Sequence, residues 1–262
     1  MKLGVNIDHI AVLRQARQIN DPIITDALFF CKNAGANMIT IHLREDRRHI
    51  NDKDVKDIIS LSPLPVNLEC SLNKDIIDIV KTHKPYMATI VPEKREELTT
   101  EGGLDLKKFE KEILKTKKIL EDEGIIVSLF VDPSNDVIDM CHKLQISNVE
   151  LHTGKYANIY AMLYGNLGLS SHSIKELELP KEQLKQKLND TYKAIIASAN
   201  LSEFYGIKVA AGHGLNYENV KDILKIKNIK ELNIGQSIVA KSVFIGLEKA
   251  IKKMKKIINE TR

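Results

Sequence analysis

The sequence contains no tryptophan and only three cysteines among its 262 residues. Cys31, Cys70 and Cys141 lie far apart and form no pair with the spacing of a zinc site. An odd number of cysteines and the lack of a signal-peptide pattern favour a reducing compartment, because secreted small domains usually pair their cysteines. We therefore expect a cytoplasmic protein.

Long apolar runs and long basic tracts are also missing. No apolar stretch approaches the roughly 20 residues that a membrane-spanning helix needs. The formal net charge is only +4, from 39 basic and 35 acidic residues. The lysines between positions 252 and 256 alternate with apolar residues, as in an amphipathic helix with a solvated face. These absences argue against a membrane or nucleic-acid partner.

What the chain does contain is an alternation of short apolar runs and longer helical patterns from end to end. Eight such units in about 260 residues match the size of a (β/α)₈ barrel, and we expect one barrel domain over residues 1–262. A doubly wound sheet is the alternative, but it usually has a glycine-rich first turn, which is absent here. The expected strands are Leu3–Ile7, Met38–His42, Val66–Cys70, Met87–Val91, Ile125–Val131, Val149–His152, Ile207–Ala211 and Glu231–Ile234.

Two segments depart from the even rhythm. The polar stretch Val91–Asp105 contains Gly102 and Gly103 next to threonines, which suits either a phosphate-reaching lid or an ordinary surface loop. The segment around residues 155–180 is rich in tyrosine and then in serine. We expect it to be an insertion in the barrel.

The stretch from His42 to His49 directly follows an apolar run that reads as a buried strand. Within eight residues it supplies two imidazoles, three guanidinium groups and two carboxylates. Arginine binds phosphate or carboxylate with paired hydrogen bonds, and histidine moves protons near neutral pH. The stretch therefore suggests proton chemistry on an anionic substrate.

Polar residues recur at the ends of the other expected strands. In a barrel these ends meet at one rim, where catalytic groups stand. The residues are Asn6, Asp8, His9, His42, Arg44, His49, Glu69, Glu93, Lys94, Arg95, Asp132, Glu150, His152, Thr153, His213 and Asn233.

Two of these residues carry the strongest individual signals. Glu69 lies in an apolar strand, where a carboxylate is costly unless it is paired or functional. It is either a general acid or base, or one half of a structural ion pair. His213 stands between two glycines, which let a ligand approach the backbone closely.

Anions have two expected binding regions. The loops at Gly214 and at Gly235–Gln236 follow the last two strands and precede helices, whose N-termini favour anions. The arginines around Arg14 and Arg17, and those in 44–48, could supply a second site. Two sites suit two phosphorylated substrates or one bisphosphate. A metal held by His42, His49 and Glu69 is not expected, because the neighbouring arginines oppose a cation.

Longer motifs resemble a known family over nearly the whole chain. The resemblance is to pyridoxine 5′-phosphate synthase. It is carried by Gly4–Ala11, His42–His49, Asn67–Glu69, Val91–Arg95, Thr99–Asp105, Glu150–Gly154 and Ala211–Leu215.

This resemblance implies a (β/α)₈ TIM barrel with extra helices, assembled as a homo-octamer of dimers. It implies condensation of 3-amino-2-oxopropyl phosphate with 1-deoxy-D-xylulose 5-phosphate to give pyridoxine 5′-phosphate, phosphate and water. No metal or organic cofactor is expected.

Roles carry over residue by residue from the same resemblance. His42 and Glu69 are similar to the family's proton acceptors and His213 to its proton donor. The deoxyxylulose phosphate contacts would be Asp8, His9, Arg44, His49 and Thr99. The aminoketone phosphate contacts would be Asn6, Arg17, Gly214, Gly235 and Gln236, with Arg17 acting across a subunit interface. The family often has histidine where this chain has Gln236, which can donate a hydrogen bond but carries no charge.

Two other classes of protein remain open from the residues alone. A barrel aldolase or isomerase would act on one sugar phosphate, and a Schiff-base aldolase would need a lysine at a strand end. A phosphometabolite-binding protein would bind without turnover and would leave Glu69 and His213 unexplained.

Overall fold

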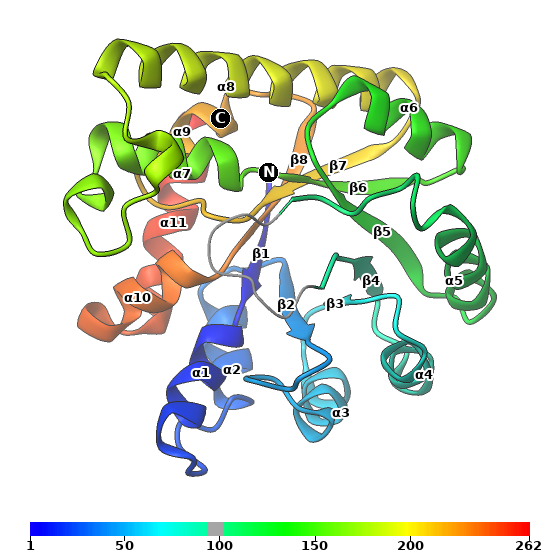
Figure 1. Ribbon diagram of the computed structural model, residues 1–262. Coiled ribbons are helices and arrows are strands. Elements are labelled where there is room, and N and C mark those ends of the chain that lie inside the picture. Colours follow the sequence, from blue (N-terminus) through cyan, green and yellow to red (C-terminus); the bar gives the residue numbers. More distant parts are fainter. Residues whose placement is uncertain (94–101) are drawn as a thin grey trace.

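The computed structural model describes residues 1–93 and 102–262, so Thr99, Lys94 and Arg95 lie outside the described residues. The described strands form one closed parallel barrel in the order of the chain, from β1 to β8 and back to β1. Figure 1 shows the strands at the centre and helices around them. The strands are β1 (Lys2–Asn6), β2 (Met38–Leu43), β3 (Val66–Cys70), β4 (Met87–Ile90), β5 (Ile126–Val131), β6 (Asn148–His152), β7 (Lys208–Gly212) and β8 (Ile229–Ile234).

This architecture confirms the predicted (β/α)₈ barrel, and each strand begins and ends within two residues of its predicted bounds. The described helices surround the strands and include additional ones beyond a single helix per strand. They are α1 (Asp8–Arg17), α2 (Asp26–Asn33), α3 (Asp52–Leu61), α4 (Lys74–His83), α5 (Glu110–Asp122), α6 (Asn135–Lys143), α7 (Gly154–Tyr164), α8 (Lys181–Phe204), α9 (Val220–Leu224), α10 (Gln236–Ile245) and α11 (Leu247–Thr261).

The residues around 155–180 form α7 and two short 3₁₀ turns, Leu167–Leu169 and Lys175–Leu177. They lead into α8, the long helix at the top of Figure 1. None of the helices in the described ranges has the length and apolar composition that a membrane crossing requires.

The hydrophobic core lies between the strands and the helices. Alternate strand residues such as Ile39, Ile41 and Leu68 are fully buried in it, because successive side chains of a strand point to opposite faces. The residues between them face the barrel interior, where the Thr40 hydroxyl donates to Oδ1 of Asn233 at 3.2 Å. This alternation also determines which side chains reach the rim.

Polar side chains occupy the barrel interior below that rim. The Thr89 hydroxyl donates to the side-chain oxygen of Asn67 at 2.8 Å, and Gly4 leaves room for Asn233, whose Oδ1 would lie 2.1 Å from an added Cβ. The polar layer satisfies buried groups by hydrogen bonding within the barrel. It also gives the cavity above it a polar floor.

Candidate active site

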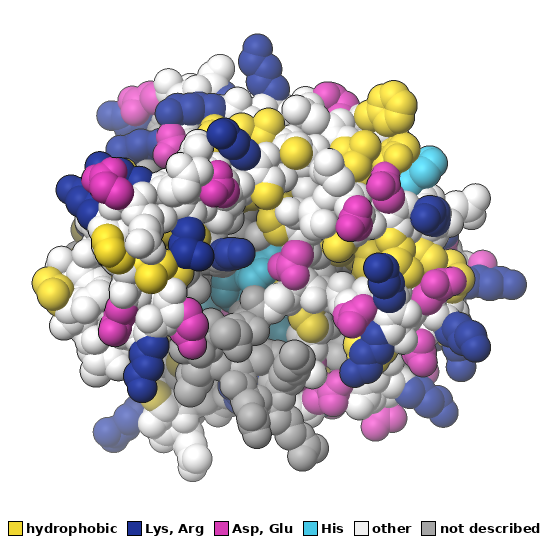
Figure 2. All heavy atoms as spheres, turned by 45° about the horizontal axis from the view of Figure 1, so that its top comes forward, with side chains coloured by type: hydrophobic (Ala, Val, Ile, Leu, Met, Phe, Trp, Pro, Cys, Tyr) yellow, Lys and Arg dark blue, Asp and Glu magenta, His cyan; other side chains and the backbone are white. Residues whose placement is uncertain are grey.

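A cavity of about 500 Å³ opens at the carboxyl ends of the strands, a volume within the usual range for small-molecule sites. Figure 2 shows histidine side chains in a hollow of this face. The cavity is lined by most of the residues expected from the sequence: Asn6, Asp8, His9, His42, Arg44, His49, Glu69, His213, Gly214, Gly235 and Gln236.

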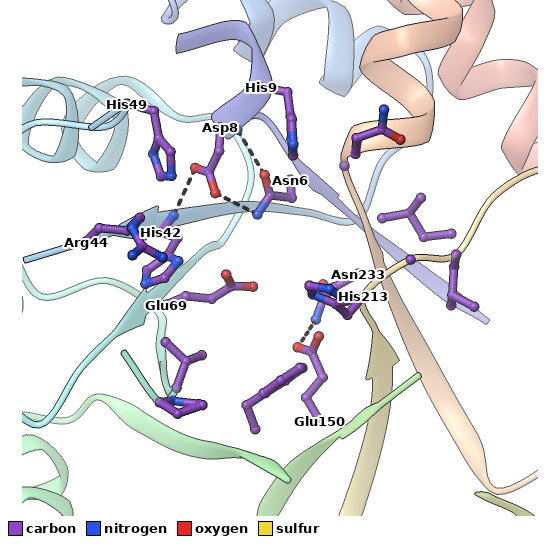
Figure 3. Close-up of a pocket in the computed structure, with 18 of the residues that line it drawn as sticks. Asn6, Asp8, His9, His42, Arg44, His49, Glu69, Glu150, His213 and Asn233 are labelled. Atoms are coloured by element: carbon purple, nitrogen blue, oxygen red, sulfur yellow. Dashed lines mark hydrogen bonds between the residues drawn. The ribbon is translucent and has the colours of Figure 1, made fainter. Parts of the chain in front are cut away.

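His42 and Glu69 lie side by side at the rim. They are paired across the β2–β3 ladder, so their side chains leave the sheet on the same face. In Figure 3 both side chains reach into the cavity, with His213 on the opposite side. Three groups capable of proton transfer therefore surround one space.

The imidazole of His42 is held in its neutral form. Burial, with smaller contributions from the nearby His49 and Arg44, lowers its pKa to about 3. Within the described residues its Nε2 atom is buried and has no hydrogen-bond partner. A neutral ring with an available nitrogen can accept a proton from a substrate.

Asp8 connects the first two strands at the rim. Its Oδ1 accepts the backbone N–H of His42 at 2.9 Å, and its Oδ2 accepts the amide of Asn6 at 2.9 Å. Burial raises the pKa of Asp8 to about 7, although these two hydrogen bonds oppose the shift. The carboxyl is thus poised to change charge near neutral pH, and Figure 3 shows it above His42.

His49 presents one defined nitrogen to the cavity. The backbone N–H of Ile50 donates to Nδ1 of His49 at 2.8 Å, so the proton of the neutral ring resides on Nε2. Burial lowers the pKa of His49 to about 4, with a further contribution from Arg44. His49 is therefore a hydrogen-bond donor through Nε2.

A buried ion pair supports the segment that carries His49. The guanidinium of Arg14 makes two bonds of 2.7 Å to the carboxylate of Asp54 and donates to the carbonyl of His49 at 2.9 Å. Asp54 also closes a capping box with Asn51 at the start of α3. Arg14 is thus paired with Asp54 and is not among the residues that line the cavity.

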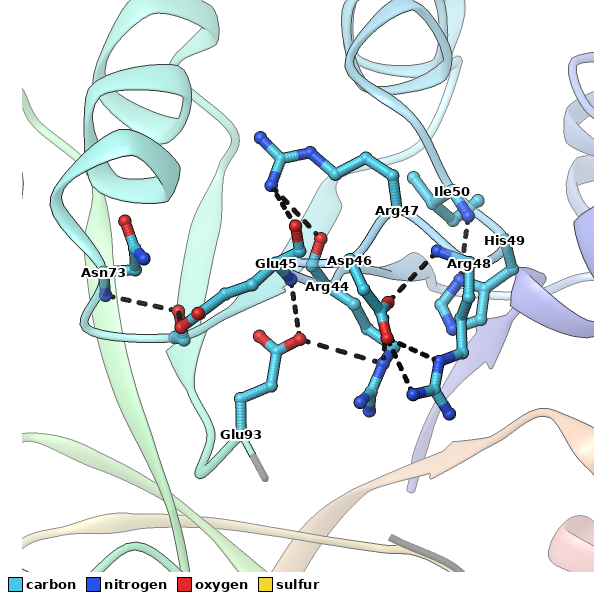
Figure 4. A network of polar contacts seen from close by, with 10 residues as sticks. Arg44, Glu45, Asp46, Arg47, Arg48, His49, Ile50, Asn73 and Glu93 are labelled. Atoms are coloured by element: carbon cyan, nitrogen blue, oxygen red, sulfur yellow. Dashed lines mark hydrogen bonds and ion pairs between the residues drawn. The ribbon is translucent and has the colours of Figure 1, made fainter. Parts of the chain in front are cut away.

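The arginines after β2 divide into surface pairs and one buried residue. Arg47 pairs with Asp52 at 2.9 Å, and Arg48 pairs with Asp46 at 2.7 Å. Arg44 is buried and lines the cavity, with its Nε 3.4 Å from Asp46 and 3.7 Å from Glu93. Figure 4 shows the contacts of Arg44 and Arg48 with Asp46 and that of Arg44 with Glu93. Among the described lining residues, Arg44 is the one with a permanent positive charge.

The opposite side of the cavity is built from the loops after β7 and β8. Gly214 has a positive φ of 74°, and an added Cβ at Gly235 would lie 2.7 Å from the Cβ of Asn6. The Ser237 hydroxyl ties the loops together by donating to the carbonyl of Leu215 at 2.8 Å. Helix α10 begins here at Gln236, so its backbone N–H groups favour an anion at this end.

Glu150 is a lining residue that the sequence did not single out for a role. It is fully buried inside the barrel on β6, and its Oε2 accepts the amide of Asn233 at 2.6 Å. Burial raises its pKa to about 8, so at neutral pH it carries a proton. Glu150 lies between the apolar residues Val149 and Leu151, just as Glu69 lies between Leu68 and Cys70. A carboxylate within an apolar strand was the reason to assign a role to Glu69, and the same reason applies to Glu150.

Arg17 lies outside this cavity. It is exposed near the end of α1 and is not among the lining residues. Within the described ranges no group of three or more potential metal-ligating His, Cys, Asp or Glu side chains is gathered together.

The fold and the site together define the class of protein. A (β/α)₈ barrel whose strand ends gather proton-transfer groups and a buried arginine around one cavity is an enzyme acting on small anionic molecules. Solved barrels share the fold. Phosphoribosylanthranilate isomerases from Thermotoga maritima and Pyrococcus furiosus both match over 99% of each chain with a TM-score of 0.59, at 11% and 12% identity.

Sequence comparison identifies the family. Residues 3–260 match the family model described as pyridoxal phosphate biosynthesis protein PdxJ. Pyridoxine 5′-phosphate synthase from Aliarcobacter butzleri is 60% identical over 98% of this chain and 99% of its own length. The enzyme of the same name from Nitratiruptor sp. is 57% identical over 99% and 98%. The chain belongs to this family of vitamin B6 biosynthesis enzymes, which confirms the resemblance seen in its motifs.

Asp54→Ala should lower the free energy of unfolding by about 3–5 kcal/mol, because it leaves the Arg14 guanidinium buried without its counterion. Urea denaturation followed by circular dichroism measures the change. Asp57→Ala is the matched control, since Asp57 lies on the same helix and pairs with the exposed Lys53. Equal losses in the two variants would contradict the structural importance of the Arg14–Asp54 pair.

Glu150→Gln should remove a pH dependence of stability. Between the ordinary glutamate pKa and about 8, the folded wild type holds a proton on Glu150 that the unfolded chain releases. Wild-type stability therefore falls as the pH rises through this window, by up to about 1.4 kcal/mol per pH unit. The glutamine variant loses no such proton, so its stability relative to wild type should increase from pH 5 to pH 7.5. Urea melts at both values measure this, with the exposed Glu110→Gln as control, and a constant difference would contradict it.

Proposed function

We propose that this chain condenses 3-amino-2-oxopropyl phosphate with 1-deoxy-D-xylulose 5-phosphate to form pyridoxine 5′-phosphate, phosphate and water. The observation that carries the proposal is the gathering of His42, Glu69 and His213 around one cavity. Ring formation includes imine formation, loss of phosphate and loss of water, and each step moves protons. Several acid and base groups around one space suit such a sequence of steps.

Two anion-binding ends support two phosphorylated substrates. On one side Arg44 provides a buried positive charge and His49 donates through Nε2. We assign this side to the deoxyxylulose phosphate, with Asp8, His9 and Thr99 as further contacts. Holding both partners by their phosphates lowers the entropic cost of bringing the reacting carbons together.

The other side is assigned to the aminoketone phosphate. The N-terminus of α10 and the loops with Gly214, Gly235 and Gln236 form this end. Backbone N–H groups at a helix N-terminus attract a phosphate without any charged side chain. Gln236 can therefore occupy this position without a positive charge. Asn6 completes the contacts from β1.

The proton-transfer roles are assigned by the resemblance to the family, and the charge states of His42 and Glu150 agree with them. His42 is neutral and accepts a proton, as does Glu69 beside it, while His213 donates from the opposite side. Glu150 carries a proton at neutral pH because burial raises its pKa to about 8. Its carboxyl can therefore donate a hydrogen bond to negative charge that develops on an intermediate.

A neighbouring subunit would account for the position of Arg17. Helix α1 exposes Val12 and Leu13, and α10 exposes Val243 and Phe244, which is 85% exposed. Such an apolar surface on neighbouring helices suits subunit contact, and Val12 also lines the cavity. We propose a homo-octamer of dimers in which Arg17 reaches the site of the partner subunit. Sedimentation velocity of the purified chain measures the assembly.

The remaining parts of the proposal concern surroundings and cofactors. The protein is proposed to work in the cytoplasm, without nucleic acid or membrane and without a metal or organic cofactor. A Schiff-base aldolase is disfavoured, because no lysine is among the described residues that line the cavity. Trapping of a protein–substrate adduct by borohydride would revive that alternative.

The direct experiment mixes the purified protein with both substrates. Pyridoxine 5′-phosphate should appear by its absorbance, together with released phosphate, only when both substrates are present. Absence of product from folded protein that binds both substrates would overturn the proposal in favour of a binding protein.

Glu69→Gln should keep substrate binding and lose turnover by at least about 10²-fold, the usual scale for a general acid or base. Steady-state kinetics measure the turnover, and calorimetric titration with each substrate measures binding. The surface variant Glu110→Gln serves as control. Near wild-type turnover of Glu69→Gln would remove Glu69 from the mechanism.

A further inference from the structure

Asp132 and His152 form a pair at the rim that the proposed chemistry does not use. Asp132 follows β5, and His152 is the last residue of β6. Oδ1 of Asp132 lies 3.2 Å from Nδ1 of His152. Burial alone would raise the pKa of Asp132, but the bonds from His152 and from the Gly103 N–H hold it below its ordinary value. The ionised carboxylate can only accept, so Nδ1 of His152 carries the proton.

His152 lies directly against His213. The two rings meet edge-on, with centroids 5.0 Å apart and planes at 76°. Phe130 packs against both rings, at 4.9 Å from His152 and 6.3 Å from His213. His152 is buried, so the position of its ring limits where the His213 ring can lie.

Gly154 makes room for this arrangement. An added Cβ at Gly154 would lie 2.4 Å from Nε2 of His152 and 2.9 Å from Cδ2 of His213. Within the described residues, Nε2 of His152 is buried and has no hydrogen-bond partner. A buried polar atom without a partner is costly and calls for an explanation other than stability.

The backbone of His213 is fixed by the residue that follows His152. His213 has a φ of 77°, a conformation that is unfavourable for a residue with a side chain. The hydroxyl of Thr153 lies 2.6 Å from the carbonyl oxygen of Gly212 and 2.7 Å from that of His213. The end of β6 therefore contacts both the backbone and the ring of His213.

We propose that Asp132 and His152 are positioning residues for His213: Asp132 fixes the tautomer and orientation of His152, and His152 holds the His213 ring in place for proton donation. The pair does not touch the substrate in this account. The inference rests on the proposed function, because it assigns the donor role to His213.

The charge of Asp132 adds an electrostatic effect. Its carboxylate lies 3.2 Å from Nδ1 of His152, and a negative charge near the His213 ring favours the protonated form of the donor proposed at position 213. Among the described residues, Lys155 at the start of α7 acts on Asp132, and Glu69 and Glu150 line the cavity together with His213. They are unchanged in a variant at position 132, so the difference from wild type reports on Asp132.

The test compares Asp132→Asn and His152→Gln with wild type. Each variant should lower kcat by roughly tenfold or more, a part of the 10²–10⁴-fold that a general acid supplies, while KM for both substrates changes little. In Asp132→Asn the loss of activity at alkaline pH should begin at a lower pH than in wild type. Asp132→Glu should restore part of kcat.

A second Asp and His on the protein surface provide matched controls. Asp139 accepts the hydroxyl of Tyr205 at 2.7 Å, and His142 stacks on the same tyrosine. Asp139→Asn and His142→Gln should leave kcat and its pH profile unchanged. Thermal unfolding of all variants identifies losses that come from the fold.

A ligand-free measurement separates this inference from the proposed function. Nitrogen-15 NMR of the histidine rings should show His213 titrating at a lower pH in Asp132→Asn than in wild type, whether or not the chain makes pyridoxine 5′-phosphate. Unchanged titration of His213, or variants with wild-type kcat and pH profile, would overturn the positioning role. Absence of wild-type turnover with the expected NMR change would instead contradict the proposed function alone.

Discussion

Burial of ionisable side chains at the mouth of the barrel is the constraint on which the rest of this site depends. A charged group removed from water is costly, so the buried group adopts its neutral form unless a partner compensates. His42 and His49 therefore remain unprotonated, while Asp8 and Glu150 hold protons more tightly than in water. The cavity contains acceptors and donors in their reactive forms near neutral pH.

The closed barrel creates this burial by its geometry. Alternate residues of parallel strands point inward, so Thr40 and His42 of β2 share a face with Asn67 and Glu69 of β3. The interior layers are filled by side chains that bond one another, such as Thr89 with Asn67. Water is replaced by fixed dipoles, which cost no reorganisation when charge moves during a reaction.

The cost of burying charged side chains also limits the positive charge in the site. Arg14, Arg47 and Arg48 each bond a carboxylate within their own neighbourhood. Arg44, which also approaches Asp46 and Glu93, is the permanent cation among the described lining residues. At the other end of the cavity a helix N-terminus attracts an anion without a charged side chain. These two ends suit the proposed pair of anionic substrates, whose reacting carbons would then meet between the proton-transfer groups.

Much of this arrangement could be predicted from the sequence. Apolar runs such as Met38–Leu43 identify the strands, and His42, Glu69 and His213 stand where those runs end. The partner of Arg14 could not be predicted, because Asp54 is 40 residues away along the chain and the contact depends on how α1 and α3 pack. The positive φ of His213 was equally hidden, since flanking glycines indicate a turn but not which residue adopts the strained conformation. Glu150 lies in an apolar strand, as Glu69 does, but only the structure shows that both side chains line the same cavity.

The protonation state of His42 in the ligand-free protein tests the central claim most directly. Nitrogen-15 NMR of a sample with labelled histidine, assigned with His42→Gln, follows the ring across the pH range. The account predicts that His42 stays neutral down to about pH 5, well below the ordinary histidine pKa of about 6.5. Titration of His42 near pH 6.5 would contradict the claim that burial keeps this ring in its neutral form.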